Sequence, residues 1–134
     1  MSSMMQLLRR DERLRTFSTA LELSSLSLLV DEERPVTVLA PTNLAFSRLG
    51  DEKLLQWFQN PQLLSEVLRH HLVSGRLEAR DLIRMRIVRT FGGGLVRIKA
   101  FTDHVKVGEA SMENCDIKAD NGVLHLLDRV LQRA

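Results

Sequence analysis

The sequence predicts a single α+β domain in which helices occupy the N-terminal half and strands mostly follow in the C-terminal half. Two observations indicate this order. Apolar residues of the N-terminal half recur every three or four positions, as on one face of a helix, and in the C-terminal half they alternate with polar residues, as in a half-buried strand. The chain is 134 residues long, the size of one domain, and its sequence contains no linker, internal repeat or low-complexity tract. We therefore expect one compact domain over residues 1–134.

The N-terminal half is expected to contain helices around one strand. Helical spacing of apolar residues runs over residues 4–21. The apolar run at 36–40 predicts a buried strand that stops at Pro41. Shorter helices are expected at 43–49 and 51–58.

A longer helix should begin at Pro61, because proline suits the first helical turn, where its missing N–H is not needed. Leu64, Leu68 and His71 share its apolar face, and Gly75 is the expected C-terminal cap. On that face His71 is expected to be a buried core histidine, with its ring nitrogens bonded to nearby backbone or side-chain groups.

Strands are predicted for most of the C-terminal half. The glycine triplet at 92–94 should form the hairpin turn that opens this region, since residues 95–101 and 105–107 alternate between apolar and polar side chains. The final apolar run begins at Asn121-Gly122, a strong turn signal, and carries apolar residues at both odd and even positions. It is therefore predicted to be a central strand with both faces buried.

Composition excludes several classes of protein. With 44% hydrophobic and 27% charged residues the chain is typical of a globular domain. No apolar run approaches the roughly 20 residues of a membrane helix, so we do not expect an integral membrane protein. The single cysteine, Cys115, excludes an internal disulfide. The N-terminus lacks the apolar core of a signal peptide, so the chain either stays inside the cell or has lost an export signal.

Most of the positive charge comes from arginine, but the formal net charge is only +2 because acids are interleaved with it. One group of arginines is dense enough to suggest a polyanion site, yet Glu78 and Asp81 lie within it. Its members are Arg76, Arg80, Arg84, Arg86 and Arg89. We interpret the group as a solvated face and expect no nucleic-acid partner, with an arginine-driven binder of an anionic polymer kept as an alternative.

Candidate catalytic and metal-binding residues are few. A zinc site needs several ligands held together, whereas the adjacent His70 and His71 would point about 100° apart on a helix, so no metal site is predicted. The glycine triplet lacks the lysine of a nucleotide-binding loop. Cys115 and His125 could form a nucleophile and its base, but no third group orients them. We expect no catalysis and no cofactor, and keep a small hydrolase that uses His71 or His125 as the second alternative.

Three segments resemble the signature motifs of the fasciclin-like (FAS1) domain family. TVLAPTNLAF at 37–46 is similar to the first motif, and DNGVLHLLDRVL at 120–131 is similar to the second. LRHHLV at 68–73 resembles the Tyr-His segment between them, with His71 on the family histidine and His70 where many members have tyrosine or asparagine. The motifs follow the family order, and the resemblance covers a core from about residue 4 to 131.

The resemblance implies a fold and a function. The fold would be a curled β-sandwich or wedge of mostly C-terminal strands, flanked by N-terminal helices. The function would be that of a non-catalytic cell-adhesion or interaction module, which binds a protein, cell-surface or matrix partner and needs no cofactor. Because such domains are usually exported, we expect a secreted, cell-surface or periplasmic protein, and we expect it to be a monomer.

The motif residues are expected to be structural. In the first motif Thr42 should cap the following helix with its hydroxyl, Asn43 should bond the local backbone, and Phe46 should fill the core. The same structural role is assigned to His71, Asn121, Gly122 and His125.

The partner contact is predicted elsewhere in the chain. Asp116 and Ile117 match a short Asp-Ile segment that animal adhesion members carry just before the second motif, and that is implicated in integrin recognition. The flanking Cys115 and Lys118 do not match it. Residues 111–118 are expected to form an exposed loop that presents Asp116 and Ile117 on a rigid scaffold, with the alternative that Ile117 only packs against the sheet.

Overall fold

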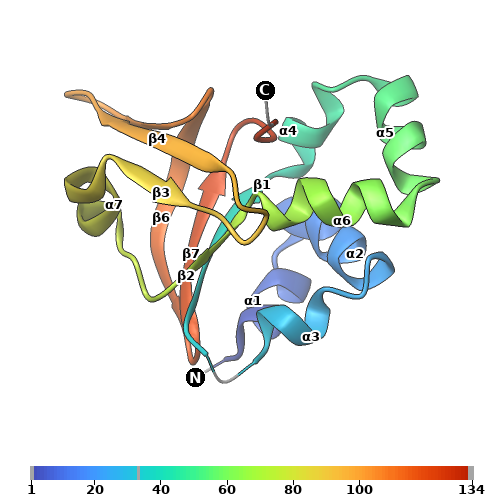
Figure 1. Cartoon of the computed structure of the whole chain (residues 1–134), viewed down its shortest axis with the longest axis horizontal. Coiled ribbons are helices and arrows are strands. Elements are labelled where there is room, and N and C mark those ends of the chain that lie inside the picture. Colours follow the sequence, from blue (N-terminus) through green and yellow to red (C-terminus); the bar gives the residue numbers. More distant parts are fainter. Residues whose placement is uncertain (1, 33, 133–134) are drawn as a thin grey trace.

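The computed structural model describes residues 2–32 and 34–132, which form one α+β domain with most helices on one side and a curled sheet on the other (Figure 1). The helices are α1 (Met4–Arg10), α2 (Arg15–Leu23), α3 (Ser27–Val30), α4 (Asn43–Ser47), α5 (Asp51–Phe58), α6 (Pro61–Arg69) and α7 (Ala79–Met85), with a short 3-10 helix at Glu12–Leu14. The strands are β1 (Val36–Pro41), β2 (Leu72–Ser74), β3 (Ile87–Arg89), β4 (Leu95–Ala100), β5 (Val105–Val107), β6 (Ala110–Ala119) and β7 (Gly122–Leu127). The predicted fold class is confirmed.

The strands form one sheet in the order β2-β1-β7-β6-β5-β4-β3. β1 and β7 run parallel, and the other neighbouring pairs are antiparallel. The sheet curls until its two ends meet, because Val73 in β2 pairs with Thr90 beyond β3. Beside this bridge the N–H of Phe91 donates to the carbonyl of Leu72 over 2.8 Å. The sheet is therefore nearly closed, as the expected curled architecture requires.

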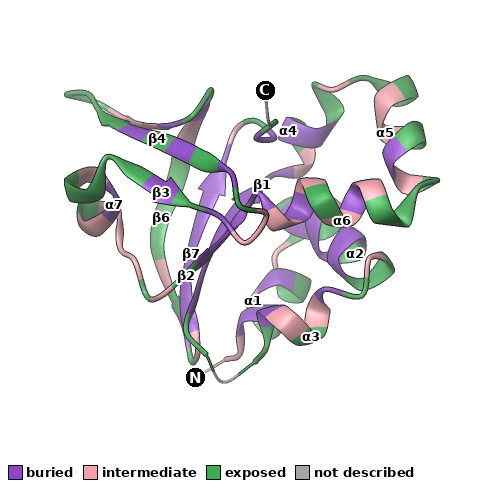
Figure 2. Cartoon of the chain, viewed as in Figure 1, coloured by how far each residue is buried: buried purple, intermediate pink, exposed green. Residues whose placement is uncertain are grey.

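β1 and β7 are buried on both faces because a core lies on each side of them (Figure 2). On one side Val36, Val38 and Ala40 pack with apolar residues of α1, α2 and α6. On the other side Leu39 and Leu127 pack with residues of β3, β4, β5 and α7 inside the curled sheet. Two cores explain why the last apolar run has apolar residues at odd and even positions, and the prediction of a strand buried on both faces is confirmed.

Helix α6 is shorter than the sequence predicts. It begins at Pro61, as expected, but it ends at Arg69, so Gly75 does not cap it. The chain leaves the helix and joins the sheet, where the N–H of Leu39 in β1 donates to the carbonyl of His71 over 2.8 Å. Strand β2 follows at once, and Gly75 lies just after it with a φ of +100°.

The predicted hairpin at the glycine triplet is present. Residues 92–94 lie in the turn between the antiparallel strands β3 and β4. Val96 and Ile98 of β4 face the core and alternate with exposed residues, but Ala100, which the alternation also places inside, is exposed at the end of the strand.

Residues 111–118 form most of strand β6, which contradicts the exposed loop predicted from the sequence. β6 pairs with β5 and β7. Its pairing with β7 is irregular, with register shifts between Met112 and Asn114 and between Asn114 and Ile117. Asp116 lies in the second shift with a φ of +59°. Residues 113–116 of the strand are exposed, which explains why the segment has the polar composition of a loop.

Candidate functional site

The first motif is a helix start built on the end of β1. The hydroxyl of Thr42 accepts a hydrogen bond from the N–H of Ala45 over 3.2 Å and so caps α4. Phe46, one turn into the helix, is only 1% exposed and belongs to the helical core. Both side chains serve the fold and neither is available to a partner.

Asn43 joins α4 to the segment that leads into α2. Its Oδ1 accepts a hydrogen bond from the N–H of Thr16 over 2.9 Å, and its Nδ2 donates to the carbonyl of Glu12 over 2.7 Å. The sequence predicts a local bond, but these partners are 27 and 31 residues away. Thr16 lies in the first turn of α2, where backbone N–H groups have no partner inside the helix. Asn43 therefore caps a helix that is distant in the sequence.

The substitution Asn43→Asp should lower the free energy of unfolding by about 1–3 kcal/mol. Aspartate keeps the acceptor for Thr16, but it replaces the donor to Glu12 with a second acceptor that repels the carbonyl. Urea denaturation measures the change. Leu44→Gln, at the neighbouring exposed position, should change stability by less than about 0.5 kcal/mol. Equal stability of the two variants would show that Asn43 does not hold the two helices together.

His71 connects α6 to the C-terminal segment. Its ring is fully buried, with Nδ1 2.8 Å from the carbonyl oxygen of Val67 and Nε2 2.8 Å from the backbone nitrogen of Leu131. Because Nε2 accepts the bond from the N–H of Leu131, the proton of the neutral ring lies on Nδ1, which donates to Val67. Burial lowers the pKa of His71 to about 3, so the ring is neutral around pH 7 and both nitrogens are occupied.

The second motif fastens the N-terminal helices to the sheet. Asn121 accepts a hydrogen bond from the N–H of Met4 over 3.0 Å and donates to the carbonyl of Val30 over 2.7 Å. The next residue, Gly122, lies so close to β1 that a Cβ atom on it would be 1.7 Å from the carbonyl oxygen of Val36. Both residues therefore hold elements together.

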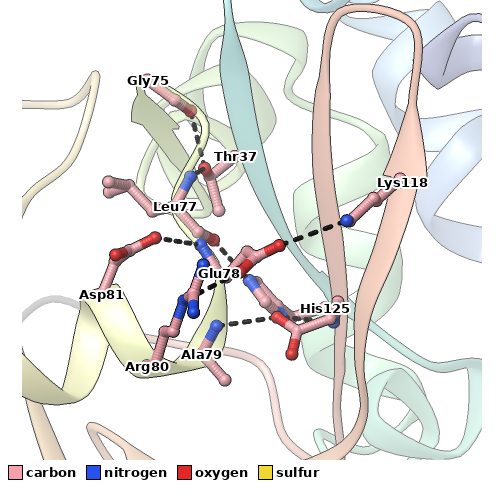
Figure 3. A network of polar contacts seen from close by, with 10 residues as sticks. Thr37, Gly75, Leu77, Glu78, Ala79, Arg80, Asp81, Lys118 and His125 are labelled. Carbon is pink, nitrogen blue, oxygen red and sulfur yellow. Dashed lines mark hydrogen bonds and ion pairs between the residues drawn. The ribbon is translucent and has the colours of Figure 1, made fainter.

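His125 is buried in β7 and ties this strand to β6 and to the segment before α7 (Figure 3). Nε2 donates to the carbonyl of Leu77 over 2.8 Å, and Nδ1 accepts from the N–H of Asp116 over 3.1 Å. Burial lowers the pKa of His125, although the bond to Leu77 and the nearby carboxylates oppose this effect. The ring is therefore a neutral connector.

The two predicted contact residues have different surroundings. Asp116 accepts a hydrogen bond from the N–H of Ala79, the first residue of α7, over 2.8 Å, while 42% of its side chain stays exposed. Ile117 is half-buried and packs against the helical core. The structure places both on a paired strand, with Asp116 presented at the start of α7.

Charged side chains at the start of α7 and in β6 form ion pairs with one another (Figure 3). Glu78 forms ion pairs with Arg80 over 3.1 Å and with Lys118 over 3.4 Å. Arg76 donates to a backbone carbonyl over 2.5 Å. Two members of the arginine group noted in the sequence thus have partners within the chain, and the side chain of Arg80 is still 77% exposed.

The candidate catalytic residues noted in the sequence, His71, His125 and Cys115, do not form a reactive pair. His71 and His125 each use both ring nitrogens on backbone groups. Partial burial and the neighbouring Asp116 raise the pKa of the Cys115 thiol, which disfavours the nucleophilic thiolate. Within residues 2–32 and 34–132, no three His, Cys, Asp or Glu side chains lie close enough to hold a metal ion. Nor does any helix in these ranges have the length and apolarity to cross a bilayer.

Two open cavities flank the C-terminal segment at Leu131, and the sequence pattern indicates neither. The first, of about 480 Å³, is mostly apolar and contains Trp57 and Phe91. The second, of about 990 Å³, lies between the C-terminal segment, the end of α4 and the turns of the curled sheet. Its charged lining residues are Arg48, Arg97, Lys106, Glu109 and Arg129. They lie far apart in the sequence, so only the fold brings them together.

A nearly closed sheet beneath a helical layer, with the motif side chains holding the elements together, defines a scaffold domain. The chain belongs to the fasciclin domain family, which matches residues 12–133. The resemblance noted in the sequence is thereby confirmed.

Relatives of this chain include bacterial and animal proteins. It is 32% identical over 131 residues to the protein sll1735 of Synechocystis sp., and the match covers 98% of each chain. It is 28% identical over 134 residues to human periostin, with 98% of this chain but only 16% of periostin covered. Its fold is similar to a FAS1 domain pair from the insect cell adhesion molecule fasciclin I, with a TM-score of 0.85 at 14% identity, covering 98% of this chain and 51% of the other. The chain therefore corresponds to a fraction of the large animal relative and to about half of the insect pair.

Proposed function

We propose that residues 1–134 form a single non-catalytic adhesion or interaction module that binds a protein or surface partner. One observation carries the proposal: His71 and His125, the residues that the hydrolase alternative would use, each engage both ring nitrogens with backbone groups. A general base needs a nitrogen lone pair that can reach the substrate. The two rings instead hold the C-terminal segment and β6 in place.

Family membership supports the same role. The insect protein with this fold is a cell adhesion molecule, and the chain shares its whole architecture with one domain of that protein. We extend the proposal to a secreted, cell-surface or periplasmic protein that acts as a monomer and needs no cofactor.

The proposed contact surface is centred on Asp116, with Ile117 beside it. The hydrogen bond from Ala79 fixes the carboxylate while 42% of the side chain stays exposed. A charge held in place before binding loses less conformational entropy when a partner arrives. The exposed part of Ile117 can add an apolar contact, although much of this side chain packs inward.

The substitution Asp116→Asn should weaken attachment about tenfold, as expected when one partner of a charged contact is lost. Asparagine keeps an acceptor for Ala79 and tolerates a positive φ, so stability should fall by no more than about 1 kcal/mol. To measure attachment, surfaces are coated with each variant. The cells that produce the protein, or matrix prepared from them, are added, and the amount retained is determined. Glu52→Gln, at an exposed position on α5, is the matched control and should retain attachment.

Two results would count against this proposal. Equal attachment by the Asp116→Asn variant and the original chain would remove Asp116 from the contact. Absence of attachment, together with hydrolysis of ester or amide substrates that is lost in His71→Gln or His125→Gln variants with retained fold, would favour the hydrolase.

A further inference from the structure

We propose that the cavity of about 990 Å³ binds an acidic polysaccharide, a linear chain that carries carboxylate or sulfate groups. We call this cavity the basic groove and define it by its four cationic lining residues, Arg48, Arg97, Lys106 and Arg129. The inference names a partner chemistry for an interaction module and so rests on the proposed function. It concerns a surface other than the one around Asp116.

Positive charge is concentrated in the basic groove. Among the residues that the structure describes, four lysines and arginines line it, but only one acid, Glu109. This excess is larger than the net charge of +2 for the whole chain. Within residues 2–32 and 34–132, none of the four cations has a carboxylate oxygen within 4.0 Å, the limit for an ion pair. The groove thus presents cations that the described part of the chain does not neutralise.

One wall of the basic groove is a face of β4 and β5. Lys99 in β4 lies directly opposite Lys106 in β5, and residues paired in this way share one face of the sheet. Arg97 lies two positions before Lys99 and therefore faces the same side. Like charges directly opposite each other destabilise a sheet. Lys99 is not among the lining residues, and its ammonium lies 5.2 Å from the centroid of the Phe101 ring. A polyanion bound at Lys106 would relieve the repulsion between the two lysines, which adds support for an anionic ligand.

The other wall comes from the segments that follow α4 and β7. Arg48 follows α4 and Arg129 follows β7. Figure 1 shows the C-terminal segment and α4 together, with β4 across from them. Cations on both walls of an open groove can contact charges along a ligand that runs between them.

The lining favours a polysaccharide over the other polyanions. No Phe, Tyr or Trp is among the described residues of the groove, whereas proteins that bind single-stranded nucleic acid stack bases on such side chains. Protein–protein interfaces are enriched in Tyr, Trp, Phe and Met as well as in Arg, and the described lining of the groove includes none of the first four. β4 and β5 are each paired on both sides, so neither offers a free edge to an added peptide strand. To bind an acidic polysaccharide, a groove needs only cations held in fixed positions, and the basic groove provides them.

Titration calorimetry with the whole chain tests the ligand class. The probes are polygalacturonate oligomers for carboxylate and dextran sulfate for sulfate, with neutral dextran, oligo-dT and polyglutamate for comparison. We expect one or both acidic polysaccharides to bind with an affinity that falls steeply between about 50 and 200 mM salt, because binding releases counterions. Neutral dextran should not bind. Tighter binding of oligo-dT or of polyglutamate would overturn the assignment in favour of nucleic acid or an acidic protein.

Paired variants test the location. The double substitution Arg97→Gln with Lys106→Gln should weaken polysaccharide binding about tenfold and reduce its salt dependence. It should not lower the melting temperature, since it removes the repulsion between Lys106 and Lys99. Arg80→Gln with Arg84→Gln, which removes the same charge from the arginine group noted in the sequence, should leave the affinity unchanged. Equal weakening by both double variants would mean that overall charge, and not the groove, attracts the ligand.

The two proposals fail separately. If neither acidic polysaccharide binds while attachment still depends on Asp116, the groove inference is wrong and the proposed function stands. If a polysaccharide binds in the groove but surfaces coated with the original chain retain neither cells nor matrix, the adhesive role fails and the groove inference stands.

Discussion

The substitution Gly122→Ala should prevent stable folding, because the start of β7 has no room for a methyl group. A Cβ atom at this position would lie 1.7 Å from the carbonyl oxygen of Val36 and 2.8 Å from its carbonyl carbon. Both are backbone atoms of β1, and Val36 is the register partner of Gly122 in the parallel pair. The clash can be relieved only if β1 and β7 move apart, and these strands separate the two cores.

We expect a loss of more than about 4 kcal/mol in the free energy of unfolding, which is exceptional for one methyl group. Circular dichroism, NMR dispersion and urea denaturation report it. Gly93→Ala is the matched control, since Gly93 has a φ of +85° and nothing lies within 4 Å of its added Cβ. Its cost should be only about 1–2 kcal/mol, from backbone strain. Similar stability of the two alanine variants would contradict the close approach of β1 and β7.

Gly122 also shows how far the sequence predicts this fold. Asn121-Gly122 indicates a turn between strands, and the chain does turn there, from β6 into β7. The close approach that requires glycine comes from parallel pairing with β1, a strand that lies far earlier in the chain. Local pattern therefore predicts the turn and the buried strand, but not the neighbour that excludes a side chain.

The wrong predictions have the same physical origin. α6 ends before its apolar periodicity does, because His71 and Leu72 bond to β1 and to the segment after β3. Residues 111–118 have a polar composition, yet β6 is held by pairing with β5 and β7 on either side. The partners of α6's end lie far along the chain and those of β6 are its sequence neighbours, but in both cases hydrogen bonds of the sheet override the local preference.

Of the two candidate sites, the sequence indicates the one at Asp116 and does not indicate the basic groove. Asp116 and its neighbour Ile117 resemble a short segment of animal family members, so a local pattern indicates this site. The hydrogen bond from Ala79 to Asp116 cannot be predicted in this way, because it depends on the placement of α7. The basic groove carries no such signal, because its cations come from separate elements. The density of arginine along the chain points to another group, in which Arg80 is paired with Glu78.

Acidification should destabilise the protein between about pH 6.5 and pH 3, chiefly through His71. In the folded chain burial lowers the pKa of His71 from 6.5 to about 3, and in the unfolded chain the ring regains its ordinary value. Between these values the unfolded state binds a proton that the folded state does not. The free energy of unfolding therefore falls by about 1.4 kcal/mol for each pH unit below 6.5. The contribution is fully present above pH 6.5, and His125, whose pKa burial also lowers, acts in the same direction.

Urea denaturation at intervals from pH 7.5 to pH 4 tests this origin. His71→Gln should lower stability at pH 7 by about 2–3 kcal/mol, through lost packing and the bonds to Val67 and Leu131, and should reduce the pH dependence by about one proton. Leu64→Ala, a core substitution in α6 with an expected loss of about 2–5 kcal/mol, keeps His71 and should keep the full slope. A His71→Gln variant with the original slope would mean that other groups control acid unfolding. A variant with the original stability at pH 7 would mean that the ring does not secure the C-terminal segment.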